Sequence, residues 1–263
     1  MDAELEAGTA AHYEDAAYYT STYARRIDDV AFYVALARRS RGPVLEYGIG
    51  NGRIALPIAR HGIEVVGVDR SEPMLADLRD RLRREPDDVQ ARVEAVRGDM
   101  RTAKLHRRFP LVVATFNTVL HLYARQDVEA FLARVREHLA PGGRFVVDLS
   151  VPPLAELARD PGQAFHAPRF MHPTAGVVVK NRERFDYDPA RQVLFVSMEF
   201  EPLGDPDGAW MTPLAHRQFF PREWEALLHY NGFVVERIEG DFEGGPLTRE
   251  SDMMVFHARR RRS

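Results

Sequence analysis

The sequence predicts a doubly wound α/β domain with a mostly parallel sheet and an antiparallel insert, and two observations carry this prediction. From Val44 to Ser150, short apolar runs typical of buried parallel strands alternate with amphipathic helical segments. After Ser150 this rhythm gives way to prolines and then to segments in which apolar and polar residues alternate, as in antiparallel strands. We therefore expect one α/β domain interrupted by a smaller β element.

The elements of the α/β domain can be placed from periodicity and from helix start and stop signals. A helical pattern over 25–40 ends before Gly42, and its apolar side consists of Ile27, Val30, Val34 and Leu36. We expect strands at 43–48, 63–69, 91–99, 109–117, 142–150, 233–240 and 252–260, and further helices at 52–62, 73–84, 127–140 and 221–232. These strands make a sheet of seven. Three antiparallel strands are expected in the insert, at 176–188, 192–202 and 212–220, after a proline-punctuated loop.

The composition excludes several classes of protein. The 263 residues contain no cysteine, which excludes disulfides, thiolate nucleophiles, cysteine-ligated zinc and iron–sulfur clusters. The formal net charge of −3 gives no broad positive field for nucleic acid or anionic membranes. No segment approaches the roughly 18 apolar residues of a membrane span, and the N-terminus does not resemble a signal peptide, so we expect a cytoplasmic protein.

Three glycines lie between the first strand and the following helix. Gly48, Gly50 and Gly52 form the pattern E-x-G-x-G-x-G with Glu46. A glycine turn before a helix lets a ligand approach unpaired N–H groups, although it can also be no more than a tight turn. A Walker loop would need Gly-Lys-Ser/Thr, and a dinucleotide fingerprint would need a glycine where Arg53 stands, so neither fits.

Two acidic residues indicate what kind of ligand the turn accepts. Asp69 ends the second strand, 19 residues after Gly50, where its carboxylate can accept hydrogen bonds from both hydroxyls of a ribose. A carboxylate at Glu46 suits a ligand that carries an ammonium or another cationic centre. Asp69 also precedes Ser-Glu-Pro and could serve only in starting a helix.

Five segments of the sequence resemble, in order and spacing, the motifs of class I S-adenosylmethionine-dependent methyltransferases. They are "VLEYGIGNGR", "VVGVDRSEPML", "VRGDM", "FPLVVATFNTVLHL" and "HLAPGGRFVVD", and together they cover about residues 43 to 150. The resemblance implies a Rossmann-like methyltransferase fold with S-adenosyl-L-methionine as cofactor. The N-terminal tyrosines, the insert and the ending "FFPREWEALLHYNGF" are similar to the small-molecule branch, which includes amino-sugar N,N-dimethyltransferases and glycine N-methyltransferases.

The resemblance assigns cofactor contacts by position. Asp69 would hold the ribose, Asp99 would accept a hydrogen bond from the adenine amine, and Met100 would pack on the adenine ring. The full set of expected cofactor-binding residues is Tyr19, Arg25, Glu46, Gly48, Gly50, Asn51, Gly52, Asp69, Arg70, Ser71, Met74, Gly98, Asp99, Met100, Thr115, Phe116 and Asn117. Two positions depart from the family's usual residues, because Asn51 replaces a small Thr or Ser and Ile49 replaces a Cys or Ala.

Three residues are candidates for the acceptor side, and the resemblance supports two of them, His121 and Tyr23. His121, just past the fourth strand, is the candidate for a base or for a group that orients the acceptor, and its alternative is a structural histidine. Tyr23 matches a tyrosine near the acceptor, and its alternative is an aromatic contact that packs the N-terminal helix. His216 is a candidate for lining a substrate pocket. The remaining histidines have no metal-ligand spacing, so no metal is expected.

These assignments divide the chain into three parts. Residues 1–42 are expected to form a helical cap over the active site, 43–150 with 221–263 the cofactor-binding domain, and 151–220 a loop and antiparallel β insert that serves as a substrate lid. An exposed insert of this kind would offer a natural surface for a homodimer.

The function predicted in this way is methyl transfer by in-line displacement to a small molecule, at nitrogen, oxygen or carbon, with an amine slightly favoured. A nucleic-acid acceptor is not expected, because the cytosine C5 enzymes need a thiolate and "TFNTVLHL" lacks the Asn/Asp-Pro-Pro-aromatic element of enzymes that act on flipped adenine. The alternative function is a regulatory or scaffold protein that binds the cofactor but has lost its acceptor site.

Overall fold

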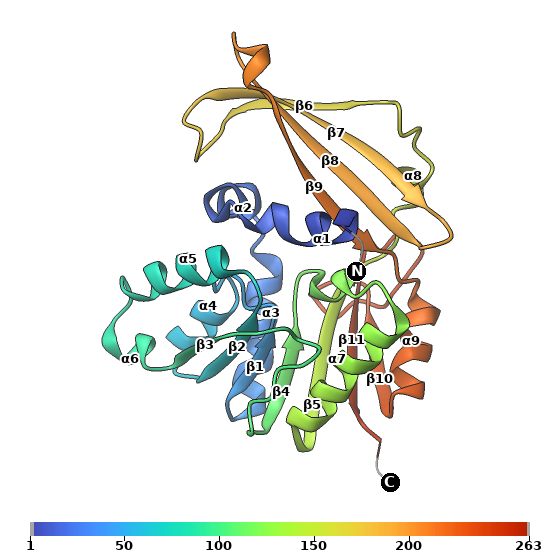
Figure 1. Ribbon diagram of the computed structural model, residues 1–263. Coiled ribbons are helices and arrows are strands. Elements are labelled where there is room, and N and C mark those ends of the chain that lie inside the picture. Colours follow the sequence, from blue (N-terminus) through green and yellow to red (C-terminus); the bar gives the residue numbers. More distant parts are fainter. Residues whose placement is uncertain (1–2, 262–263) are drawn as a thin grey trace. The chain divides into compact units, whose positions relative to one another are not determined.

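The computed structural model describes residues 3–261 and separates the chain into two compact units (Figure 1). The smaller unit combines the chain up to Arg25 with Pro152–Gln218, and the larger unit combines Arg26–Val151 with the chain from Phe219 onward. Residues 26–42, grouped above with the N-terminal segment, thus belong to the larger unit.

The larger unit is built on a seven-stranded sheet with the order β10-β11-β5-β4-β1-β2-β3. The strands are β1 (Val44–Tyr47), β2 (Val65–Asp69), β3 (Val93–Arg97), β4 (Phe109–Ala114), β5 (Leu139–Ser150), β10 (Phe233–Glu239) and β11 (Met253–Arg260). β3, β2, β1, β4 and β5 pair in parallel, and β11 pairs antiparallel with both β5 and β10. All seven predicted strands are confirmed. Because β1 lies between β2 and β4, the strand order reverses beside β1, and in open α/β sheets ligands bind at such a point.

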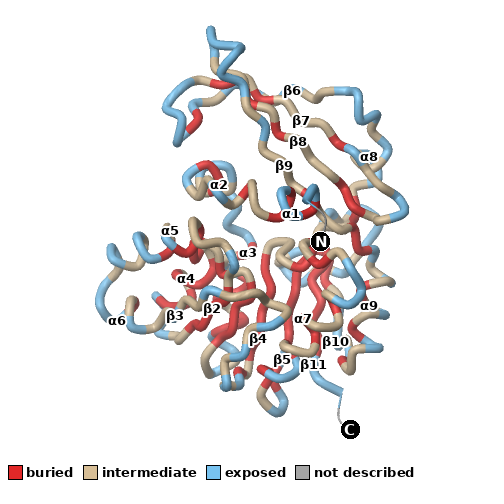
Figure 2. Tube along the Cα trace, viewed as in Figure 1, coloured by how far each residue is buried: buried red, intermediate tan, exposed pale blue. Residues whose placement is uncertain are grey.

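Helices cover both faces of this sheet. They are α3 (Asp28–Ser40), α4 (Ala55–Arg60), α5 (Glu72–Leu82), α6 (Asp87–Gln90), α7 (Arg125–His138) and α9 (Pro221–Tyr230), with a short 3-10 helix η2 at Thr118–His121. Successive strand residues point to opposite faces, so Val112 of β4 joins the core under α7 and α9 while its neighbour Val113 joins the core under α3, α4 and α5. Figure 2 shows the buried residues concentrated along the central strands. This double burial explains the nearly continuous apolar strands in the sequence.

The helix starts mostly follow local chemistry. Ser71 caps α5 by accepting a hydrogen bond from the N–H of Met74, and Pro221 occupies the first turn of α9. One expectation for α3 was wrong: Ile27 does not belong to its apolar side. The residue lies before the helix, and 65% of its surface is exposed.

The smaller unit is a four-stranded antiparallel sheet with the order β6-β7-β8-β9, together with short helices. The elements are α1 (Ala3–Ala10), η1 (Ala11–Tyr13), α2 (Ala16–Tyr23), α8 (Leu154–Leu157), β6 (Phe165–Met171), β7 (Val178–Asp188), β8 (Val193–Pro202), η3 (Pro206–Gly208) and β9 (Trp210–Arg217). Three strands were expected here, with a loop where β6 lies. Pro168 indicated a loop, but β6 is an edge strand with a register shift between Ala167 and Phe170, and both features tolerate a proline.

The two faces of the small sheet differ. On one face, ion pairs join β7 to β8, such as Lys180 with Glu201 at 2.5 Å and Arg184 with Glu199 at 2.8 Å. On the other face, a cluster that includes Val179, Met198 and Phe200 packs with other side chains of the unit. Among the described residues of the whole chain, no helix is long and apolar enough to cross a membrane.

Candidate active site

The three glycines of the turn after β1 have different tasks. All three have positive φ values, of 73°, 53° and 79°, which favour glycine. A Cβ on Gly48 would lie 2.3 Å from Oγ1 of Thr118, and one on Gly52 would lie 2.4 Å from Cδ1 of Leu78. A Cβ on Gly50 would instead meet only Cε of Met74, at 3.3 Å, and groups at 4.0 Å. Gly48 and Gly52 are thus required by the packing of the turn itself, and Gly50 leaves its face open.

The structure shows how Ile49 fits at a position where the resembled family usually has the smaller Cys or Ala. Ile49 is buried, and a Cβ on Gly67 of β2 would lie 2.1 Å from its Cδ1. The neighbouring strand therefore makes room for the larger side chain with a glycine. Asn51, the other departure, is also buried.

Asp69 lies at the end of β2 and fixes the turn. Its Oδ2 accepts a hydrogen bond of 2.7 Å from the N–H of Gly50, and its Oδ1 accepts one of 2.8 Å from the N–H of Ser71. Burial raises the pKa of this carboxyl, although the N–H groups of Ser71 and Gly50 oppose the shift. Each oxygen keeps a second lone pair, so the predicted bond to a ribose hydroxyl remains available.

Glu46 is the most unusual residue of the site, because a carboxyl with 1% of its surface exposed sits in the central strand β1. Oε1 accepts a hydrogen bond of 3.0 Å from the hydroxyl of Thr115, and Oε2 has no partner among the described residues. Burial raises the pKa of Glu46 to about 8. A buried carboxyl with an unmatched oxygen beside a ligand-binding turn is suited to a cationic group.

The chain after β4 is held in an uncommon conformation. Phe116 and Asn117 have φ values of 54° and 64°, in the left-handed region that residues other than glycine rarely adopt. Asp148 of β5 accepts two hydrogen bonds from the N–H of Phe116, at 2.9 and 3.0 Å, and one of 2.5 Å from the hydroxyl of Tyr33. Asn117 is held by Ser150, whose N–H donates to its Oδ1 at 2.7 Å. Hydrogen bonds from β5 therefore hold Phe116 and Asn117, the residues after β4 that were predicted to face the ligand.

Asp148 is itself buried, and burial raises its pKa to about 6, against the opposing hydrogen bonds from Tyr33 and Phe116. Neither Asp148 nor Tyr33 was among the site residues predicted from the sequence. The available signal was an acidic residue inside the otherwise apolar segment "RFVVDLS".

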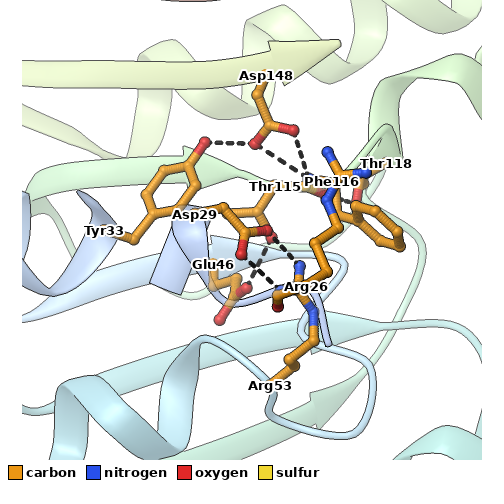
Figure 3. Close-up of polar contacts among 9 residues, drawn as sticks. All are labelled: Arg26, Asp29, Tyr33, Glu46, Arg53, Thr115, Phe116, Thr118 and Asp148. Atoms are coloured by element: carbon orange, nitrogen blue, oxygen red, sulfur yellow. Dashed lines mark hydrogen bonds and ion pairs between the residues drawn. The ribbon is translucent and has the colours of Figure 1, made fainter. Parts of the chain in front are cut away.

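The ring of Phe116 lies against two guanidinium groups (Figure 3). Arg26 and Arg53 place their Cζ atoms 4.6 and 4.8 Å from its centroid. Arg53 is held by Asp29, which is fully buried and accepts hydrogen bonds of 2.7 and 2.6 Å from the two terminal nitrogens. The arginine that excluded a dinucleotide fingerprint is therefore part of a rigid wall next to the glycine turn.

The residues expected around the adenine lie after the ends of β2 and β3 and in the first turn of α5. Met74 is buried, Met100 packs against the core, and the N–H of Gly98 donates to the carbonyl of Asp69 at 2.8 Å. Asp99 is engaged by Arg101, whose backbone N–H and Nε donate to Oδ1 at 2.8 and 2.9 Å. These bonds lower the pKa of Asp99, so it stays a carboxylate and can accept a further hydrogen bond.

His121, the candidate base, ends the short helix η2 that follows Thr115–Asn117. It is half-buried, and its Nδ1 lies 3.5 Å from the hydroxyl oxygen of Tyr123. The structure thus places His121 in the segment that leaves the carboxyl end of β4, as the sequence predicted.

Four of the predicted site residues lie in the smaller unit, namely Tyr19, Tyr23, Arg25 and His216. Tyr19 and Tyr23 are neighbours on α2, with ring centroids 4.8 Å apart, and Arg25 follows them with an exposed side chain. The hydroxyl of Tyr23 lies 3.1 Å from Nε2 of His12, a buried histidine that was not among the predicted site residues. Burial lowers the pKa values of His12 and of His216 in β9 to about 4, so both imidazoles are neutral.

Comparisons with known proteins agree with this geometry. Residues 44–143 match the model of a methyltransferase domain family. The cypemycin N-terminal methyltransferase of a Streptomyces species is 35% identical over 121 residues, 46% of either chain. The dTDP-3-amino-3,4,6-trideoxy-alpha-D-glucopyranose N,N-dimethyltransferase of Streptomyces venezuelae is 32% identical over 126 residues, 48% of this chain and 50% of that protein. The matches thus span about half the length of these curated relatives.

A solved structure extends the similarity to most of the chain. The CcbJ methyltransferase of Streptomyces caelestis superposes with a TM-score of 0.77 at 29% identity, over 89% of either chain. The similarity therefore includes segments outside the matched domain.

Proposed function

We propose, from the match of residues 44–143 to a methyltransferase domain family and from the similarity to the CcbJ methyltransferase, that the chain is a class I S-adenosylmethionine-dependent methyltransferase that methylates an amine of a small molecule and releases S-adenosylhomocysteine. The observation that carries the proposal is Glu46, whose Oε2 is buried without a partner in the described structure, beside the glycine turn. The names of two relatives, an N-terminal methyltransferase and an amino-sugar N,N-dimethyltransferase, support an amine as acceptor.

The residues of the larger unit fit the proposed cofactor. Glu46 would face its cationic part, Gly50 would leave room for it, and Asp69 would accept hydrogen bonds from the ribose. Met74 and Met100 would border the adenine, with Asp99 accepting a bond from its amine. The cofactor supplies a methyl carbon on a sulfonium, so a nitrogen lone pair can form the new C–N bond while the C–S electron pair stays on sulfur.

The chain then has to position and deprotonate the acceptor. An amine at neutral pH arrives mostly as an ammonium ion, which has no lone pair for attack. We propose that His121 accepts that proton or orients the nitrogen. The wall formed by Phe116, Arg26 and Arg53 would limit the positions open to the reactants, and such positioning can contribute on the order of 7–11 kcal/mol to a barrier.

A small acceptor agrees with the net charge of −3, which offers no general attraction to nucleic acid.

A cytoplasmic location and a homodimer formed through the small sheet remain predictions that accompany the proposal. Fractionation of cells and sedimentation of the purified chain test them.

Two experiments test the proposed function. Calorimetric titration with S-adenosylmethionine measures cofactor binding. Transfer of a labelled methyl group is then measured on a panel of amino sugars, peptides with free N-termini and phenols. We expect binding and transfer to at least one amine. Binding without transfer to any member of the panel would favour a scaffold, and the absence of binding would refute the site itself.

The variant Asp69→Ala should weaken cofactor binding by about 1.5–3 kcal/mol, the range for a lost hydrogen bond to a charged group. Asp80→Ala is the matched control, because this aspartate is exposed on α5 and pairs with Arg83 at the surface. Thermal melting shows whether the turn still folds without the two bonds that Asp69 accepts. Unchanged affinity in a folded Asp69→Ala protein would remove the residue from the site.

A further inference from the structure

A cavity of about 320 Å³ lies within the smaller unit, between the N-terminal helices and one face of its sheet. Its lining residues come from two distant parts of the chain and are Ala11, His12, Glu14, Asp15, Ala16, Tyr18, His172, Thr174, Trp210 and Thr212. None of them has a role in the proposed active site. A volume at the lower end of the usual range for ligand pockets suits a ring-sized or smaller molecule.

Three aromatic side chains form the walls of this cavity. The rings of Tyr18 and His172 are stacked, with centroids 5.2 Å apart and an angle of 7° between their planes. Trp210 meets His172 edge to face at 5.2 Å and is itself stacked on Phe200 at 5.3 Å. Burial lowers the pKa of His172, so this ring adds no positive charge near neutral pH. The uncovered face of a neutral aromatic ring attracts a cation placed within about 6 Å of the ring centroid.

The charges in and beside the cavity are negative. Glu14 and Asp15 line it, and no lysine or arginine is found among the described residues that do so. Glu183 of β7 acts on the same region: burial raises the pKa of Tyr18, and the charges of Glu183 and Asp15 raise it further. Thr174 donates a hydrogen bond of 2.6 Å to Asp15, and the N–H of Tyr18 donates another of 2.8 Å, so this carboxylate is fixed in place.

The buried polar atoms of this unit that have no hydrogen-bond partner in the described structure include two that bear on the cavity. One is Nδ1 of His12, which lines the cavity and has only 3% of its surface exposed. The other is Oδ1 of Asn181, whose strand partner on β8 is Phe200, the residue that pairs with Trp210. An unmatched buried polar atom is costly, and a ligand that hydrogen-bonds to His12 would remove part of that cost.

We propose that this cavity is a binding site for a small organic ammonium ion. Trp210, which is stacked on Phe200 through one face, would offer its other face to the cation. Asp15 and Glu14 would balance the charge of the cation, and His12 would meet a polar group of the same molecule. The site does not depend on the proposed methyl transfer, because all of its residues lie in the smaller unit and none binds the proposed cofactor.

Choline and its neutral isostere 3,3-dimethylbutan-1-ol are suitable probes, since they share a shape and differ in charge. We expect the 263-residue chain to bind choline at least fivefold more tightly than the alcohol by calorimetry, and choline to change its tryptophan fluorescence. Equal affinity for the two compounds, or no binding of choline, would overturn the proposal.

Substitutions then locate the charge that is recognised. Asp15→Asn combined with Glu14→Gln should weaken choline binding at least fivefold, and the amide introduced at position 15 can still accept the bond from the N–H of Tyr18, which keeps the start of α2. Asp160→Asn in the loop after α8 is the matched control and should bind choline like the unchanged protein. If the double variant keeps its choline affinity, the cavity is not the site. Trp210→Leu gives a second test that leaves the carboxylates intact, and it should also weaken binding at least fivefold.

Discussion

Glu46 connects the charge of a ligand to the protonation of a single buried side chain. With its pKa raised to about 8 by burial, the carboxyl is mostly protonated at pH 7 in the ligand-free protein. A cationic ligand placed against Oε2 would favour the carboxylate. Cofactor binding at pH 7 should therefore release about one proton from this group.

Calorimetry in two buffers with different ionisation enthalpies measures that release. The variant Glu46→Gln should abolish it and should weaken binding roughly tenfold or more, because a charged partner of the ligand is lost. The amide oxygen can still accept the bond from Thr115, so the strand should keep its conformation. Equal proton release in the variant and the unchanged protein would show that another group loses the proton.

At the residue scale, the sequence identifies site residues that belong to a short motif. It does not reveal site residues that are brought together from distant parts of the chain. Glu46 and Asp69 stand at fixed distances from the glycines and were both identified. Asp148 acts on Phe116, 32 positions away, and accepts from Tyr33, 115 positions away. No local pattern reports such a contact. His12 was missed for the same reason, since its burial and its bond to Tyr23 appear only in the folded smaller unit.

At the scale of the element, alanine substitutions can show how far the fold depends on the glycine at position 48 of the turn. Gly48→Ala should lower the free energy of unfolding by about 2–4 kcal/mol, because it adds left-handed strain and an overlap with Thr118. Gly62→Ala is the matched control: its φ is 79°, a Cβ there meets nothing within 4 Å, and only the strain of about 1 kcal/mol applies.

Chemical denaturation of the two variants measures the difference. The double variant Gly48→Ala with Thr118→Ala should recover part of the loss, since the first clash is with the threonine side chain. Equal destabilisation by Gly48→Ala and Gly62→Ala would mean that strain alone explains the glycine at position 48.

The elements of the larger sheet were predictable because two-sided burial leaves a strong pattern. β1, β2 and β4 each read as short apolar runs, and each lies within its predicted range. β6 was not predictable in the same way. Its burial alternates weakly, and its proline sits at a sheet edge where the missing N–H is tolerated. Helix ends also shifted: α4 begins at Ala55, three residues after the expected start at 52, because the glycine turn continues further.

At the scale of the whole molecule, the two units combine segments that the sequence presents far apart. In the smaller unit, α1 packs so closely against β9 that a Cβ on Gly8 would lie 2.5 Å from the Cβ of Ala215. Position 8 therefore has no room for a side chain, because of a residue more than half the chain away. Partnerships of this kind cannot be read from periodicity, which describes single elements and not what they pack against.

The two units should respond to pH in opposite directions. In the smaller unit, His12 and His216 have folded pKa values near 4, below the unfolded value of 6.5, so they stay neutral in the fold and take up protons on unfolding. Their contribution to stability is present above pH 6.5 and is lost as the pH falls toward 4, by on the order of 2 kcal/mol for each residue at pH 5. In the larger unit, Glu46 has a folded pKa near 8, above its unfolded value of 4.5. Its contribution is present below pH 4.5 and is lost as the pH rises toward 8.

Fluorescence can follow each unit separately, because the only two tryptophans are Trp210 in the smaller unit and Trp224 in the larger one. In single-tryptophan variants made with Trp224→Phe or Trp210→Phe, lowering the pH from 7 to 5 should reduce the melting temperature reported by Trp210. Raising the pH from 6.5 to 8 should reduce the melting temperature reported by Trp224. The variant Glu46→Gln should remove most of this decrease at high pH, and it should leave the decrease that Trp210 reports at low pH unchanged. Shifts of the same sign and size at both tryptophans would show that the chain unfolds as one cooperative body and that these buried groups do not set its pH dependence.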